Sequence, residues 1–382
     1  MPLRTPMPAE NTDDSAILDS LENLADRNRL LERLNGELRA QWNFGSIALV
    51  GWRPGDGGIH YLAVPALMVF SSAQKHRRIV HGERMMGERT FKDIAELLEA
   101  KIEHFSFDLA EDRPAPVSPA DINSVFNRYA ITQTRNRAVF LHDIAGFSLF
   151  SPEEQAAQLS TLEYSLNIAE EKIADFGTEV DLARSTTGDG YYAWNRIKGE
   201  DADVNVFCVL MVALAHQALQ HRKITQRQIP TIRTVFGRGS HYSYHQNNRV
   251  SADGSDYIVG EITINLARLI DFAKPNQILN SSLSQNSGDQ SGSSNILEFF
   301  DHAAAVLEGL RNIEMGELTI SRISTYLTGA QISDGSYAVR ELDITDKHGM
   351  KHTAYNAKVN IFLADDEPIF LGLQDENTTS IA

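Results

Sequence analysis

The sequence RAVFLHDIAGFSLFSPEE, residues 137–154, decides the fold expected for this chain. Its first part, residues 137–144, is mostly apolar, β-branched or aromatic, which predicts a short buried strand ending at Asp143 and Ile144. Residues 151–154, SPEE, then predict the start of a helix, because serine with glutamate three positions later forms a capping box and proline suits the first helical position. The stretch therefore predicts a strand, a tight turn and a helix in that order.

The segments that follow extend this order. Residues 180–187 and 191–194 are typical of strands and bracket Gly188-Asp189-Gly190, a tight hairpin signal. Further along, the pattern predicts a helix at 203–220, a strand at 230–237, a helix at 262–273 and a strand at 277–280. Strand, helix, hairpin, helix, strand is the ferredoxin-like βαββαβ order. The expected fold class is therefore α+β, with helices on one face of an antiparallel sheet.

The chain of 382 residues is long enough for more than one core. Three prolines in residues 112–119 disfavour regular structure and indicate a boundary. The expected organisation is a disordered segment at 1–14, an N-terminal helical or α+β unit for regulation or dimerisation at 15–111, a linker at 112–134 and a main domain at 135–382. We also expect a hairpin within 45–70, helices at 91–105 and 296–310, a mobile loop at 281–295, and a C-terminal β-hairpin extension that turns at 346–349.

Residues 15–40 predict a helix in which Ile17, Leu24, Leu31 and Leu38 recur every seven positions. Leu21 lies in the companion position, but Asn28 and Asn35 follow it there. Two interpretations stay open, namely a short dimeric coiled coil whose register a buried asparagine fixes, and an amphipathic helix packed on its own domain.

Charge and cysteine content limit the partners and the compartment. Lys plus Arg total 35 against 51 for Asp plus Glu, a net charge of −16, which argues against a nucleic-acid polymer as partner because phosphate chains need a basic surface. The single cysteine, Cys208, can form no internal disulfide, and residues 1–15 contain no apolar signal segment. The apolar run 206–215 is well short of the roughly 20 residues of a spanning helix. We therefore expect a cytoplasmic protein with no membrane partner.

Two aspartates are the strongest candidates for chemistry. Asp143 ends the first strand of the predicted unit, and Asp189 lies at the tip of the hairpin that pairs beside that strand. Carboxylates converging from neighbouring strand ends suit Mg²⁺ or Mn²⁺, which take oxygen ligands and keep substrate phosphates as further ligands. The sequence therefore predicts a divalent metal site here.

These residues lie in motifs that resemble those of class III nucleotidyl cyclases. FLHDIAGFS at 140–148 is similar to the family's F-x-x-D-I-x-G-F-[ST], TGDG at 187–190 to its hairpin, and RTVFGRG at 233–239 to R-x-G-I-x-x-G, with Val235 at the first glycine. DYIVG at 256–260 and KPNQIL at 274–279 resemble the stretch before the family's next helix and its return strand. The match covers roughly residues 135–283, and it makes residues 135–382 the expected catalytic domain.

The resemblance implies a homodimer with active sites at the subunit interface. It assigns two metal ions, Mn²⁺ or Mg²⁺, to Asp143, Asp189 and the carbonyl of Ile144. From the partner subunit it implies an arginine for transition-state charge, Arg268 here, and an asparagine for the ribose. The family spacing is N-x-x-x-R, whereas Asn265 precedes Arg268 by three positions and Ile264 takes the expected place. Residues i and i+3 share a helix face, so Asn265 remains the candidate.

The resemblance also identifies the base-reading positions. Purine cyclases carry Lys or Glu where this chain has Ser185, preceded by Arg184, and the second base-reading position falls at Tyr257 or Ile258. Phe147 of the first motif completes the substrate-binding candidates. A purine pocket without a charged reader would leave hydrogen-bonding groups unmatched.

The chain therefore resembles the pyrimidine cyclases of bacterial Pycsar antiphage systems. This predicts UTP, or else CTP, as the nucleoside triphosphate substrate, and a cyclic product that acts on a separate effector. The alternatives are a purine (adenylate) cyclase in signalling and an inactive, cyclase-like nucleotide sensor.

Overall fold

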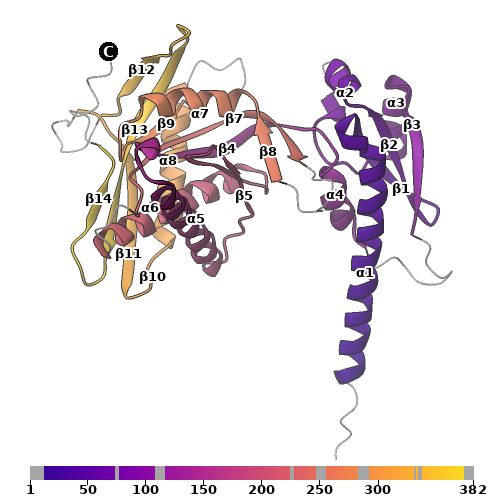
Figure 1. Ribbon diagram of the computed structural model, residues 1–382, viewed down its shortest axis with the longest axis horizontal. Coiled ribbons are helices and arrows are strands. Elements are labelled where there is room, and N and C mark those ends of the chain that lie inside the picture. The colour runs from indigo at the N-terminus through magenta and orange to yellow at the C-terminus, as the bar shows by residue number, and fades with distance from the viewer. Residues whose placement is uncertain are drawn as a thin grey trace, which may run out of the picture. The chain divides into compact units, whose positions relative to one another are not determined.

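The computed structural model describes residues 13–73, 77–107, 117–223, 228–246, 255–282, 292–330, 333 and 338–373 (Figure 1). The chain divides into two compact units, Met1–Gln133 with Ser243–Ser255 and Thr134–Tyr242 with Asp256–Ala382. The predicted disordered segment 1–14 lies almost entirely outside the described residues, as does most of the loop predicted at 281–295. We describe the two units one after the other.

The first unit is a three-stranded antiparallel sheet with helices. The strands β1 (Ile47–Gly55), β2 (Gly58–Pro65) and β3 (Lys101–Ser106) lie in the order β1-β2-β3. The helices are α1 (Asp13–Trp42), α2 (Ala66–Ala73), α3 (Glu88–Leu97) and α4 (Pro119–Asn127), with short 3-10 turns at Asn43–Gly45 and Arg77–Ile79. Side chains of α1, α4 and all three strands form one apolar core.

Three sequence expectations in this unit need correction. The predicted hairpin is present as β1 and β2, but residues from Ala66 onward form α2 instead of continuing the second strand. Of the helix expected at 91–105, only α3 is helical, and β3 is a strand because it pairs with β2 along its whole length. Part of the expected linker is α4, which begins with a Ser118 capping box, contributes Phe126 to the core and pairs Asp121 with Arg27.

The described part of α1 packs on its own unit. Leu34 and Leu38 are fully buried in the apolar core, whereas Leu24 is 48% exposed. Asn35, one of the two asparagines of the repeat, accepts a hydrogen bond from the Tyr129 hydroxyl at 2.8 Å. Over these turns the helix is therefore an amphipathic helix packed on its domain, and the side chain of Ile17 lies outside the described residues.

A matched pair of substitutions separates packing from dimerisation. Leu34→Glu should destabilise the protein by about 3 kcal/mol or more, because it buries a charge without a partner. Leu24→Glu should stay within about 0.5 kcal/mol of wild type, because that side chain is largely in solvent. Urea unfolding measures both values, and sedimentation measures assembly. If Leu24→Glu dissociated a dimer while Leu34→Glu left stability unchanged, α1 would be a dimer seam instead.

The second unit contains the predicted ferredoxin-like arrangement. In chain order its elements are β4 (Thr132–Ile144), α5 (Pro152–Asp175), β5 (Leu182–Thr186), β6 (Gly190–Asn195), α6 (Glu200–Lys223) and β7 (Ile232–Gln246). A 3-10 turn, Phe147–Leu149, follows β4, and the capping box of Ser151 and Glu154 starts α5 as predicted. The strands lie side by side in the order β7-β4-β6-β5, which places the fourth strand next to the first. The fold class is thus α+β with a βαββαβ core.

The two faces of this sheet carry different helices. Buried side chains of α5, α6 and α8 (Gly292–Gly309) pack with Phe140 and Phe236. Buried side chains of α7 (Glu261–Phe272) pack with Leu141 and Val235, the sequence neighbours of those residues. Figure 1 shows α7 on one side of the strands and α5 and α6 on the other. Helices α5 and α6 therefore lie on one face of the sheet, as expected, and α7 covers the opposite face.

The C-terminal part extends the same sheet. After β8 (Ser255–Val259) and α7, β9 (Ile278–Ser281) runs parallel to β7 and antiparallel to β13 (Lys351–Leu363). The strand β13 pairs in turn with β12 (Glu341–Thr345), β11 (Leu318–Leu327) and β14 (Ile369–Leu371), and β11 pairs with β10 (Ile313–Met315). The hairpin predicted to turn at 346–349 is therefore present as β12 and β13, while β10, β11 and β14 were not predicted.

Helix α6 is the central core helix of this unit. Among the described residues it is the one helix long and apolar enough to cross a membrane, judged by length and composition alone. Its most apolar window is 94% buried, however, and residues such as Phe207 and Cys208 lie in the core between α5, α8 and the sheet. This burial accounts for the apolar character of the helix.

Candidate functional site

Asp143 and Asp189 come together at the ends of neighbouring strands. Asp143 pairs with Gly190 in the antiparallel register of β4 and β6, and the backbone N–H of Ile144 donates to the carbonyl of Asp189 at 2.9 Å. The close approach requires glycine, since a Cβ on Gly190 would lie 1.8 Å from the carbonyl oxygen of His142. Gly188, with φ of +101°, makes the turn that precedes Asp189. The hairpin therefore brings the two carboxylates to one place.

The carboxylate of Asp143 is buried beside both a positive and a negative group. Its Oδ2 accepts hydrogen bonds from Nε of Arg233, at 2.8 Å, and from Nη2 of the same guanidinium. Burial raises the pKa of Asp143, Arg233 opposes that shift, and the nearby Asp189 adds to it. Asp189 accepts a hydrogen bond on Oδ1 from the Thr187 hydroxyl at 3.2 Å. Two carboxylates with one arginine leave a negative charge that a divalent cation would neutralise.

The donor set fits a hard cation shared with a substrate. Within the described part of the chain, no three or more His, Cys, Asp or Glu side chains gather into a metal site. The oxygens that could serve as ligands here are those of the Asp143 and Asp189 carboxylates, with the Ile144 carbonyl as the further candidate from the sequence. Mg²⁺ is commonly held by one or two carboxylates, with substrate phosphates and water completing its shell. The residues present therefore fit Mg²⁺ or Mn²⁺ bound together with a triphosphate.

The two α7 candidates lie on one helix face, as their spacing predicts. Both are partly buried, and both are held by the β12–β13 hairpin. Asn265 Oδ1 lies 3.0 Å from Nδ1 of His352, and Nε of Arg268 lies 3.5 Å from Oδ2 of Asp346. His352 and Asp346 also contact each other, with 3.1 Å between Nε2 and Oδ2.

The two β5 candidates point to opposite faces of the sheet. Ser185 pairs with Tyr192, whose hydroxyl donates to the carbonyl of Thr263 on α7, so Ser185 lies on the α7 face. Arg184 lies on the α5 face, where its guanidinium pairs with Glu170 at 3.1 Å. Alternation along a strand forces this separation. The structure thus places Ser185, but not Arg184, on the face that carries Asp143.

The three remaining substrate-binding candidates differ in exposure and packing. Ile258 is 5% exposed and packs in the α7 core, so its side chain is structural, whereas Tyr257 is 38% exposed. Phe147 follows β4 in the short 3-10 turn and packs partly against the α5 and α6 core. Tyr257 is thus the most exposed of the three, and the half-buried Phe147 also keeps part of its surface accessible.

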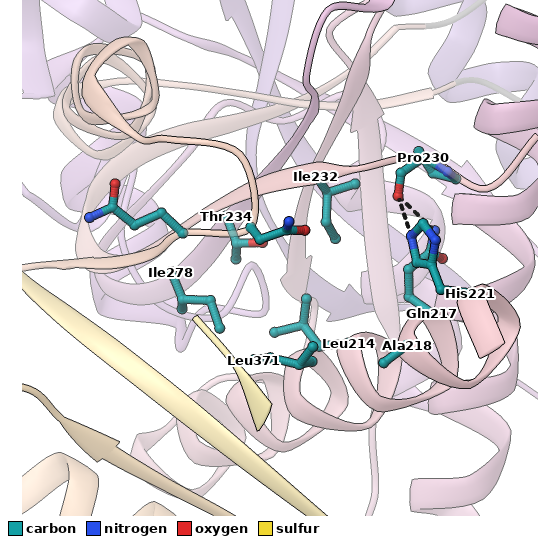
Figure 2. A pocket seen from close by; sticks show the side chains of 11 residues that line it. Leu214, Gln217, Ala218, His221, Pro230, Ile232, Thr234, Ile278 and Leu371 are labelled. Atoms are coloured by element: carbon teal, nitrogen blue, oxygen red, sulfur yellow. Dashed lines mark hydrogen bonds between the residues drawn. The ribbon is translucent and has the colours of Figure 1, made fainter. Parts of the chain in front are cut away.

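A separate pocket lies on the α6 face of the sheet. Figure 2 shows that Leu214, Ile232, Ile278 and Leu371 line it together with polar side chains of α6 and β7. The carbonyl of Pro230 at its rim accepts a hydrogen bond from Gln217 Nε2 at 3.3 Å. Ile232 and Thr234 face this pocket, whereas Arg233 between them faces Asp143. The pocket is therefore not part of the Asp143 site.

Sequence reasoning gave no role to three residues of this region. Arg233 lay in a quoted motif, but its contact with Asp143 joins positions 90 residues apart. Asp346 lay in the predicted hairpin turn, and His352 follows it on β13. No local sequence pattern predicts the contact of Asp346 or of His352 with α7.

Comparison with known proteins gives structural likeness alone. No protein-family model and no curated protein sequence matches the chain. Similar solved structures include the adenylyl cyclase CyaB from P. aeruginosa, with 14% identity and a TM-score of 0.36 over 62% of this chain and 97% of that one. They also include the guanylate cyclase domain of RhGC from Catenaria anguillulae in complex with GTP (14%, TM-score 0.35, 59% and 97%) and the guanylyl cyclase Cya2 (14%, 0.34, 59% and 92%). Likeness this distant does not define an activity, so function is argued below from the residues.

Proposed function

We propose that this protein is a nucleotidyl cyclase that converts a nucleoside triphosphate to its 3′,5′-cyclic monophosphate and pyrophosphate. The observation that carries the proposal is the convergence of Asp143 and Asp189 at paired strand ends, on the sheet face that also carries Asn265 and Arg268. The order of the motifs in the sequence supports the same proposed activity. The 3′-oxygen of the ribose attacks the α-phosphorus, and the bond from that phosphorus to the leaving pyrophosphate breaks.

Each group has a defined task in this proposal. Asp143, Asp189 and the Ile144 carbonyl would hold two Mg²⁺ or Mn²⁺ ions. When bound, such ions neutralise the triphosphate and lower the pKa of the attacking hydroxyl. Arg268 supplies positive charge to the phosphorus centre during transfer, and Asn265 orients the ribose by hydrogen bonds. Arg233 holds the Asp143 carboxylate by Oδ2, so its other oxygen faces the hairpin.

The proposal places each active site between two copies of the chain. Among the described residues, no hydrogen bond or ion pair joins the Asp143 and Arg233 pair to the cluster of Arg268 and Asp346. Apolar side chains near Arg268 are also exposed, with Val259 at 43% and Ile264 at 57%. In this proposal a second copy covers these side chains and supplies its Arg268 to this copy's metal site, which is the arrangement that the family resemblance implies.

For the base, we propose a pyrimidine, with UTP before CTP. Support comes from Ser185, a short neutral side chain on the α7 face, while the neighbouring Arg184 is engaged by Glu170 on the other face. A purine reader with a long charged side chain is thus missing at this position of β5. In this proposal the enzyme works in the cytoplasm and its product acts on a separate effector. An adenylate or guanylate cyclase is the alternative outcome of the test below.

The test is product identification by mass spectrometry after incubation with equimolar ATP, GTP, CTP and UTP and Mn²⁺. We expect cyclic UMP or cyclic CMP in at least tenfold excess, because one unpaired buried hydrogen-bonding group costs roughly 1–3 kcal/mol and 1.4 kcal/mol is a factor of ten. Ser185→Lys should lower pyrimidine turnover, with Ser160→Lys, at an exposed position of α5, as the control. Mainly cyclic AMP or cyclic GMP would establish the purine alternative, and no cyclic product would refute cyclase activity.

A further inference from the structure

The β12–β13 hairpin contacts both α7 side chains, Arg268 through the carboxylate of Asp346 and Asn265 through His352, which contacts the same carboxylate. One oxygen of Asp346, Oδ1, accepts hydrogen bonds from the backbone N–H groups of His348 at 2.8 Å and Met350 at 2.9 Å. Its other oxygen, Oδ2, faces Nε2 of His352 at 3.1 Å and Nε of Arg268 at 3.5 Å. The turn therefore fixes the carboxylate through one oxygen and leaves the other to hold two side chains.

These contacts are shielded from water. The side chain of Asp346 is 4% exposed and that of His352 is 12% exposed. Burial acts to raise the pKa of Asp346. Hydrogen bonds from the N–H of Met350, the side chain of His352 and the N–H of His348 oppose this effect and lower the pKa to about 2. The group is therefore a carboxylate at neutral pH. A buried carboxylate with two N–H donors on one oxygen is a fixed anchor for a cation on the other.

The hairpin itself is tied to the sheet and to α7. Ile344 pairs with His352 across β12 and β13, and its side chain lies in the same apolar core as Leu266 and Leu269 of α7. Further along β13, Ala354 pairs with Ser281 of β9, a strand of the extended sheet. The turn is therefore held at a fixed place beside α7.

We infer that Asp346 and His352 position Arg268 and Asn265 for catalysis. The inference rests on the proposed function, which gives those two residues their tasks. Asp346 holds Arg268 at Nε, so the two terminal nitrogens of the guanidinium are left to face phosphate oxygens. His352 holds one end of the Asn265 amide, so the other end is left for the ribose. Asp346 and His352 touch no substrate in this scheme and act through their neighbours.

The two α7 residues share one anchor. Asn265 and Arg268 are three positions apart, and both their contacts lead to one group, His352 paired with Asp346. One anchor of this kind fixes the two side chains relative to each other as well as to the helix.

The kinetic test uses conservative and matched variants. Asp346→Asn keeps an oxygen for the two turn N–H groups but loses the charge that holds Arg268. We expect it, and His352→Ala, to lower kcat about tenfold or more with KM changed less than about threefold, because misplacement of transition-state groups acts on kcat. His348→Ala is the control, since the exposed side chain of His348 takes no part and its N–H remains. Wild-type kcat in Asp346→Asn and His352→Ala would overturn the inference.

A structural readout keeps this test separate from the test of function. Crystal structures of His352→Ala and Asp346→Asn should show the Asn265 amide and the Arg268 guanidinium, respectively, displaced or in several conformers. Unmoved side chains would overturn the inference even if kcat fell. If wild-type protein formed no cyclic nucleotide while Arg268 and Asn265 moved as expected, the proposed function would fail and the positioning would stand.

Discussion

Asp189→Ala is expected to lower nucleotide cyclisation at least about 100-fold while the protein stays folded, because loss of one such electrostatic group normally costs that much. Asp189 is half-buried in the hairpin turn, and its side-chain hydrogen bond comes from Thr187 within the same turn. Its backbone carbonyl, which accepts from Ile144, is retained in the variant. The substitution therefore removes a metal ligand and little of the packing.

Three measurements define that result. Turnover is measured with the preferred nucleotide, Mn²⁺ binding by electron paramagnetic resonance, and stability by thermal unfolding. Asp201→Ala is the control, because the side chain of Asp201 is 93% exposed at the start of α6. More than about a tenth of wild-type turnover in Asp189→Ala, with full Mn²⁺ binding, would show that this residue does not hold a metal.

The sequence predicted the ferredoxin-like core well because its signals are local. The capping box at Ser151, the glycines around Asp189 and the apolar run of β4 each act over a few residues, and the structure contains all three features. Strand β3 was predicted as helix because its side chains suit either state, and pairing with β2 decides the outcome. Strand β11 carries an alternating pattern, buried at Ile323, Thr325 and Leu327, which is a local strand signal that the sequence prediction did not use.

The residues of the candidate site also differ in how far the sequence predicts their positions. Asp143 and Asp189 meet because β4 pairs with β6, a pairing that the βαββαβ order read from the sequence implies. The side to which Arg184 and Ser185 point depends on strand register, and a shift of one residue exchanges their faces. The anchor at Asp346 lies 78 residues beyond Arg268 and depends on the hairpin docking beside α7, which only the folded chain specifies.

Mixing two inactive variants should restore activity if each site is shared between subunits. In Asp143→Asn the amide oxygen still accepts from Arg233, so the pair stays packed while the metal ligand is lost. Arg268→Ala removes the transition-state charge from the other side of the site. A mixed dimer then has one site with both defects and one site with none. Random exchange makes half of the dimers mixed, so we expect recovery of about a quarter of wild-type turnover.

The matched control combines Asp143→Asn with Asp189→Ala. Both aspartates belong to the same strand and hairpin of one chain, so every site in that mixed dimer lacks one metal ligand and no activity should return. The two mixtures differ only in whether the second substitution lies in the metal site or on α7. Subunit exchange is checked in each by mass spectrometry of the intact dimers. If neither mixture recovered after demonstrated exchange, each chain would have to supply its own Arg268 to its own Asp143, and the interfacial site would be wrong.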